Sequence, residues 1–230
     1  MKKKENQFIS LIFNIIVPVF IMTKMSGTEG SFALGPTYSL LIAVSFPLGY
    51  GLYHFIRVKK LNFISVLGFV SVLLTGIMGM LTFITPFWFA VKEASVPAII
   101  AIVVFASIYF KHNVVQKLLF NDDIMDMERV HKELEEQHKT ELFNQTIIYA
   151  SYWVAISFVI SAILNFVLAR VILTAQPGTS EYIEQIGTMN GLSFPVIAVP
   201  CTIILVVVMF RVFKKIKEYT GLQLEDIIKK

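Results

Sequence analysis

Long apolar stretches separated by short polar ones dominate the chain, and six of them are long enough to cross a bilayer as helices. They cover about residues 8–25, 37–55, 62–83, 87–110, 146–173 and 191–213. A helix rises 1.5 Å per residue, so a hydrocarbon core of about 30 Å requires roughly 20 mostly apolar residues. The pattern predicts an all-α fold, a polytopic transmembrane bundle of six helices that forms one integral membrane domain over residues 1–230.

Two further segments mix polar and apolar residues and are predicted to lie outside the membrane. Residues 111–145 are expected to form a cytoplasmic helical connection, and residues 214–230 a cytoplasmic amphipathic tail. Apolar residues recur in the connection at helical spacing, at Ile124, Met127, Val130 and Leu134. The tail carries apolar residues at Ile216, Tyr219, Leu222, Ile227 and Ile228. Faces of this kind lie on a membrane surface or dock a partner, and lysines beside them attract anionic lipid headgroups.

Basic residues are unevenly distributed along this pattern. Seventeen of the 20 Lys and Arg residues fall in the N-terminal segment, the connection after the second span, the middle segment and the C-terminal end. Only Lys24, Lys92 and Arg170 fall in the opposite half. Because basic segments are retained in the cytoplasm, the asymmetry predicts an even number of crossings with both termini cytoplasmic.

Composition agrees with a membrane protein. Of the 230 residues, 56% are hydrophobic and 16% are charged, whereas about a quarter of residues are charged in an average soluble domain. The isoelectric point of about 9.1 reflects lysines that flank apolar runs, so no nucleic-acid partner is expected. The single cysteine, Cys201, cannot form an internal disulfide and is not expected to act as a nucleophile.

Small and polar residues follow one face of two predicted spans. On the third span they are Gly68, Ser71, Thr75 and Gly79, and on the fifth they are Ser157, Ser161 and Asn165. Small side chains let helix backbones approach in a membrane, and polar ones form hydrogen bonds between helices. We expect both faces to point inward as packing surfaces, with a homo-oligomer contact or a solute path along the fifth span as alternatives.

Four ionisable residues are predicted to share one level near the outer ends of the spans: Lys92, Glu93, Arg170 and Lys24. Lys92 and Glu93 lie about 8 Å inside the apolar run of the fourth span, where charges need partners or water. Arg170 could pair with Glu93 in a candidate intramembrane polar cluster. The alternative is that these side chains extend to the membrane interface, as long basic side chains do.

Catalytic and metal-binding patterns are not visible in the chain. An E-x-x-H spacing occurs twice in the middle segment, at Glu128, His131, Glu135 and His138. Carboxylates and imidazoles bind metals, but carboxylate-bridged sites draw their ligands from several facing helices, and these four come from one charged segment. A solvated helix face is the preferred interpretation, and we expect no enzyme activity, no cofactor and no metal.

Parts of the chain resemble the bacterial intracellular septation protein A family, also called the inner membrane-spanning family. The similarity covers residues 40–83, 86–122 and 152–170, and includes the Arg/Lys turn after the second span, Lys92, the segment "VVQKLLF" and Asn165. This resemblance implies a multi-pass protein of the bacterial cytoplasmic membrane that serves envelope maintenance or septation through contacts with the lipid bilayer and with other envelope or division proteins.

Two functions are therefore expected from the sequence. The first is a non-enzymatic envelope protein that acts through membrane and protein contacts. The second is a small-solute, lipid or ion transporter that uses the intramembrane polar cluster. It is motivated by Lys92 and Glu93, by the polar stripe on the fifth span and by prolines that interrupt the predicted helices.

Overall fold

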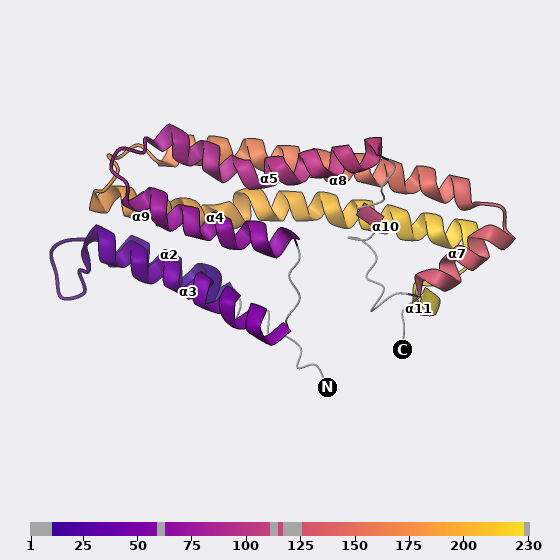
Figure 1. Cartoon of the computed structure of the whole chain (residues 1–230), viewed down its shortest axis with the longest axis horizontal. Helices are drawn as coiled ribbons and strands as arrows, with labels where there is room; N and C mark the ends of the chain where they lie inside the picture. Colours follow the sequence, from indigo (N-terminus) through magenta and orange to yellow (C-terminus); the bar gives the residue numbers. More distant parts are fainter. Residues whose placement is uncertain (1–10, 59–62, 111–114, 117–125, 228–230) are drawn as a thin grey trace. The chain divides into compact units, whose positions relative to one another are not determined.

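The computed structural model describes residues 11–58, 63–110, 115–116 and 126–227. Within these ranges the chain is helical and has no strand, so the all-α prediction is confirmed (Figure 1). The elements, in chain order, are η1 (Ile12–Ile16), α2 (Val17–Lys24), α3 (Gly35–Val58), α4 (Phe63–Met80), α5 (Pro86–Tyr109), α7 (Met127–Glu136), α8 (Thr140–Ile172), α9 (Ser180–Ser193), η2 (Phe194–Ala198), α10 (Val199–Thr220) and α11 (Leu224–Ile227).

Three helices are long and apolar enough to span a membrane. They are Pro86–Tyr109, Thr140–Ile172 and the continuous helical stretch Ser180–Thr220, which comprises α9, η2 and α10. Ile12–Lys24 and Val66–Met80 are apolar but shorter. The length and composition of the helices therefore fit a membrane protein, and the number of six crossings stays a prediction.

The last helical stretch begins earlier than the sequence pattern predicted. Residues 174–190 lie outside the predicted spans, but α9 begins among them at Ser180. The Thr179 hydroxyl caps this helix by accepting a hydrogen bond from the Tyr182 amide at 3.2 Å. The Gln185 side chain accepts hydrogen bonds from the backbone amides of Thr174 and Ala175, at 2.9 and 3.0 Å. These polar contacts stabilise a helix that an apolarity pattern alone does not reveal.

Two compact units make up the chain. The first consists of Met1–Val96 and Ala162–Ala198, and the second of Pro97–Ser161 and Val199–Lys230. Helices α5 and α8 contribute residues to both units, as does the stretch from α9 to α10. Each unit has its own buried residues, and each contains a cavity or groove of its own.

The core of the first unit lies among α2, α3, α9 and the parts of α5 and α8 that belong to it. Its fully buried large side chains include Met22, Leu40, Phe89, Leu173, Tyr182, Ile183 and Ile186. The rings of Phe89 and Tyr182 meet edge to face with their centroids 6.2 Å apart. Helix α2 lies beside both α3 and α9 (Figure 1).

Glycines allow the closest helix contacts of this unit. A Cβ atom added to Gly187 would lie 2.7 Å from Met22 Cβ, and one added to Gly191 would lie 3.4 Å from Val19 Cγ1. The two glycines are four residues apart on α9, the small-xxx-small spacing that lets membrane helices pack closely. Gly79 makes a similar contact between α4 and α3, since its added Cβ would lie 2.7 Å from Leu40 Cδ2. The predicted packing residue Gly68 has open space around it.

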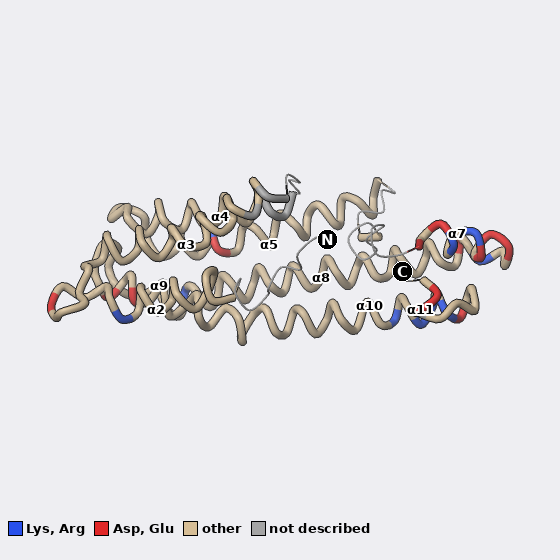
Figure 2. The backbone as a smooth tube through the Cα atoms, turned by 90° about the horizontal axis from the view of Figure 1, so that it is seen from below, with Lys and Arg blue, Asp and Glu red and all other residues tan. Residues whose placement is uncertain are grey.

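Polar helices fold against each other in the second unit. The Asp126 carboxylate caps α7 by accepting a hydrogen bond from the Arg129 amide at 3.1 Å, and the Asp126 amide donates to the Ile227 carbonyl of α11 at 2.7 Å. The Arg129 guanidinium donates to the Asp226 carbonyl at 3.1 Å. We call α7, α11 and the end of α10 the polar cap. Its charged residues gather on these helices (Figure 2).

The apolar faces of the polar cap are covered by the chain itself. Buried side chains come from α7, α8, α10 and α11 and from the turn before α11: Met127, Val130, Leu134, Phe143, Ile216, Leu222 and Ile227. The sequence pattern predicted that the face of α7 would contact the membrane or a partner. In the structure Met127, Val130 and Leu134 are used for internal packing, while Ile124 and Ile228 lie outside the described residues.

We expect Gly187→Ala to destabilise the protein by about 1–3 kcal/mol, the usual cost of overpacking. The new methyl group would overlap the Cβ of Met22, whose position is set by the backbone of α2. Gly68→Ala is the matched control, because it adds the same methyl group where nothing lies within 4 Å. Thermal unfolding in detergent should show a lower midpoint for Gly187→Ala only, and equal midpoints for the two variants would contradict the close contact.

Candidate functional site

The turn between α4 and α5 brings two polar positions to one level. Thr75 lies five residues before Met80, which is the last residue of α4. Lys92 lies six residues after Pro86, which is the first residue of α5. Both residues therefore lie about 8–9 Å along their helices from a shared turn. Because the chain reverses direction in this turn, two side chains that are distant in sequence can meet.

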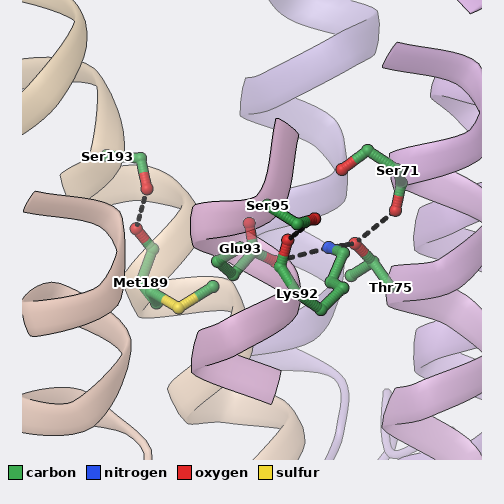
Figure 3. A network of polar contacts seen from close by, with 7 residues as sticks. All are labelled: Ser71, Thr75, Lys92, Glu93, Ser95, Met189 and Ser193. Atoms are coloured by element: carbon green, nitrogen blue, oxygen red, sulfur yellow. Dashed lines mark hydrogen bonds and ion pairs between the residues drawn. The ribbon is translucent and has the colours of Figure 1, made fainter. Parts of the chain in front are cut away.

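Lys92 is the centre of a buried polar network (Figure 3). Its Nζ atom donates hydrogen bonds to Glu93 Oε1 at 2.6 Å and to the Thr75 hydroxyl. The Thr75 hydroxyl in turn donates to the Ser71 carbonyl at 3.0 Å, and Lys92 Nζ lies 5.3 Å from the centre of the Phe89 ring. The exposed fractions of the Lys92 and Glu93 side chains are 6% and 15%, so the pair is largely removed from solvent.

Glu93 has bonding capacity that this network does not use. Lys92 and Glu93 are adjacent on the helix, and adjacent side chains point in directions about 100° apart. The two can form an ion pair because the long Lys92 side chain bends toward Glu93. A carboxylate can accept several hydrogen bonds through two oxygens. Among the described residues, Lys92 is the one hydrogen-bond partner of the Glu93 side chain, and it binds Oε1. Oε2 is therefore available to a ligand.

A cavity of about 240 Å³ lies beside this carboxylate in the first unit. Its lining includes five polar residues from η1, α4, α5 and α9: Asn14, Ser71, Thr75, Glu93 and Asn190. The other lining residues are apolar, among them Pro18, Met22 and Pro47. Drug-sized ligands occupy pockets of roughly 300–1,000 Å³, so the cavity suits a smaller solute. We call it the Glu93 cavity.

The donor set of the Glu93 cavity favours a ligand with a positive charge or several hydrogen-bond donors. Glu93 supplies a carboxylate oxygen, and Asn14 and Asn190 supply amide groups that can accept or donate. The apolar walls lower the local dielectric and so strengthen each polar contact. These groups can select a small cationic or polar solute by hydrogen bonding, and they contain no nucleophile paired with a base.

Two residues of the predicted cluster lie apart from Glu93. Lys24, at the end of α2, and Arg170, near the end of α8, are both exposed. In the part of the chain that the structure describes, neither forms an ion pair with Glu93. Lys92 is the cation that Glu93 meets, since the adjacent long side chain bends to reach it while Arg170 lies on an exposed face of α8.

The predicted stripe on α8 contributes to helix packing at Ser157. This side chain is 2% exposed and its hydroxyl donates to the Cys201 carbonyl at 3.5 Å. The Cys201 thiol donates back to the Ser157 carbonyl at 3.6 Å, which joins α8 to α10 within the second unit. Neither Ser161 nor Asn165 lines the Glu93 cavity. The stripe therefore does not extend this cavity.

His131, one of the two histidines of the E-x-x-H pattern, has contacts to the Met127 carbonyl and the Gln116 side chain. His131 Nδ1 lies 2.7 Å from the Met127 carbonyl, and Nε2 lies 3.3 Å from the Gln116 side-chain nitrogen. His138 is exposed at the end of α7. Over the described ranges, no three His, Cys, Asp or Glu residues gather in a way that could hold a metal ion.

Sequence reasoning missed two residues of the cavity, Asn14 and Asn190. An asparagine within the apolar run of residues 8–25 is itself a signal, because a polar side chain in a membrane helix usually faces the bundle interior. Asn190 was overlooked because it lies just outside the predicted sixth span, residues 191–213. Its position next to Gly191, on the helix that packs against α2, could have identified it.

Comparisons with protein-family models, with curated protein sequences and with solved structures find no match. The resemblance to the septation protein A family thus stays a prediction from the sequence. The geometry of the Glu93 cavity and of the polar cap is the basis for any functional proposal.

We expect the Lys92–Glu93 pair to show strong coupling in a double-mutant cycle. Lys92→Met leaves the Glu93 carboxylate without its cation, and Glu93→Gln leaves the Lys92 ammonium buried without its anion, which is costly in both cases. The double variant removes both charges and should be more stable than the two single losses predict, by about 1–3 kcal/mol. Thermal unfolding in detergent measures this, and additive losses would show that the pair is not coupled.

Proposed function

We propose that the protein is a multi-pass protein of the bacterial cytoplasmic membrane with six crossings and both termini in the cytoplasm. Three membrane-length helices and the one-sided distribution of basic residues support this topology. Reporter fusions at the two ends should both report the cytoplasm. Ends found in opposite compartments would exclude an even number of crossings.

We further propose that the protein binds and transports a small cationic or polar solute through the Glu93 cavity. The observation that carries this proposal is the Glu93 carboxylate, which is paired through one oxygen and lines a cavity with two asparagines. Charged residues are rare within membrane helices and usually serve a pathway or a binding site. A buried ion pair at the wall of a cavity that also contains two asparagines fits that use.

Lys92 would act in this site as a resident counter-ion. While the cavity holds no solute, the Lys92 ammonium neutralises Glu93 at 2.6 Å and is also held by Thr75. A solute with a cationic or donor group would compete with Lys92 for the carboxylate. The Thr75 hydroxyl keeps a partner available to Lys92, which reduces the cost of weakening the ion pair. Because the Thr75 hydroxyl carries no charge, Lys92 would keep its contact with Glu93 Oε1 while the solute binds Oε2, so that neither buried charge is left unpaired.

Transport should depend on the Glu93 charge. We expect proteoliposomes that contain the full chain to show flux in a panel of probes comprising Na⁺, K⁺, protons and methylammonium. Glu93→Gln should reduce that flux at least tenfold, because one charged hydrogen-bond partner of the solute is lost. Glu184→Gln is the matched control, since Glu184 is exposed on α9 and does not line the cavity. Undiminished flux in Glu93→Gln would exclude the proposed site.

A second proposal is a non-enzymatic role in envelope maintenance or septation through protein contacts of the polar cap. The burial of its apolar face leaves α7 with an exposed charged surface that includes Glu128, Lys132, Glu135 and Glu136. Such a surface suits a partner with complementary charges. Replacing Glu135 and Glu136 by Lys should then remove cross-linked envelope or division partners and the rescue of a deletion strain. Unchanged partners and rescue would contradict this role.

A further inference from the structure

The second unit contains a groove of about 500 Å³ between α8 and α10. The two helices run antiparallel along it, since Thr146 meets Tyr219 at 3.4 Å while Ser157, further along α8, meets Cys201, earlier in α10. Positions along the groove can therefore be ordered by depth. Thr146 and Tyr219 lie toward the polar cap, and residues nearer Ser157 and Cys201 lie deeper among the apolar residues of the helices.

The lining of the groove changes from polar to apolar along its length. Its mouth, toward the polar cap, includes Gln145, Thr146, Lys214, Lys215 and Glu218. Its deeper part includes Ala150, Trp153, Val208 and Val212. From Gln145 to Trp153 the helix rises about 12 Å, which is enough to separate a polar headgroup from the first part of an acyl chain. The polar mouth of the groove thus matches a phospholipid headgroup, and its apolar deeper part matches an acyl chain.

Two cations that line the groove, Arg211 and Lys214, form no ion pair with a described residue. Lys215 is paired with Glu218, whose Oε2 lies 2.9 Å from Lys215 Nζ. Arginine and lysine are the residues that bind phosphate groups, arginine through two parallel hydrogen bonds. The groove therefore has an excess of positive charge.

The groove is lined by aromatic residues of the kind that concentrate at a membrane interface. Tyr149 and Trp153 are exposed along it, with ring centroids 6.3 Å apart. Tyrosine and tryptophan concentrate where lipid headgroups meet acyl chains. Tyr149 lies between Thr146 at the mouth and Trp153 in the deeper part of α8, which matches the border between headgroup and chain.

We propose that this groove is a specific binding site for an anionic phospholipid of the surrounding bilayer. Arg211 and Lys214 bind the headgroup phosphate, Gln145 and Thr146 supply further polar contacts, and an acyl chain lies against Trp153 and Val208. The groove and the Glu93 cavity have no lining residue in common, so an experiment that contradicts one proposal leaves the other unaffected. The depth order of the groove favours a lipid over a soluble phosphate compound, since a soluble anion would leave the apolar part unfilled.

Phosphatidylglycerol binding to the purified full chain, followed by native mass spectrometry, tests the site. Arg211→Gln/Lys214→Gln should weaken binding by about 30-fold, as expected for the loss of two basic residues near a headgroup. Lys132→Gln/Lys217→Gln removes two charges of the same sign from exposed positions outside the groove and should change binding less than about twofold. Equal losses in both variants, or no loss in the first, would overturn the proposal.

Two further measurements distinguish the lipid from other ligands. In a Trp88→Phe background, Trp153 is the remaining tryptophan, and phosphatidylglycerol with brominated acyl chains should quench its fluorescence more than brominated phosphatidylcholine does. Equal quenching by the two lipids would overturn headgroup selectivity. Inorganic phosphate at millimolar concentration should not displace the lipid, and complete displacement would assign the groove to a soluble anion instead.

Discussion

The cost of holding a charge away from water determines the arrangement of the first unit. Lys92 is buried among apolar helices, and an unpaired ammonium there would destabilise the fold by several kcal/mol. Its three donor hydrogens require acceptors, and Glu93 and Thr75 are the two that the structure provides. This requirement fixes how α5 is turned about its own axis with respect to α4, since the Lys92 side chain has to reach Thr75. It also places the Glu93 carboxylate at the wall of the cavity. The same interaction therefore serves both packing and a binding site.

Much of the fold could be predicted because its cause is visible in the sequence. Apolar runs of sufficient length predict helices in a membrane protein, and a Lys-Glu pair inside such a run is conspicuous. The partner of Glu93 could not be predicted in the same way, because a pattern of apolar residues does not establish how each helix is rotated. Arg170 and Lys24 were predicted to lie at the same level as Glu93, but their side chains are exposed.

Periodicity identifies an apolar face but not what covers it. The spacing of Met127, Val130 and Leu134 was compatible with a membrane surface, a partner or the chain itself, and the structure contains the third arrangement. Similarly, Gly187 and Gly191 have the spacing of a close helix contact, yet their polar surroundings concealed the helix. Both cases depend on contacts between distant segments, which a local pattern does not contain.

The hydrogen bonds between α7 and α11 have a consequence for biosynthesis. Asp126 and Arg129 reach their acceptors on Ile227 and Asp226 only after about 100 further residues have been translated. Until then, the apolar side of α7 has no cover from the C-terminal helix and offers hydrophobic surface to chaperones or proteases. The pairing of α7 with α11 is therefore a late contact, which forms only after the segments that contain α8, α9 and α10 have been translated.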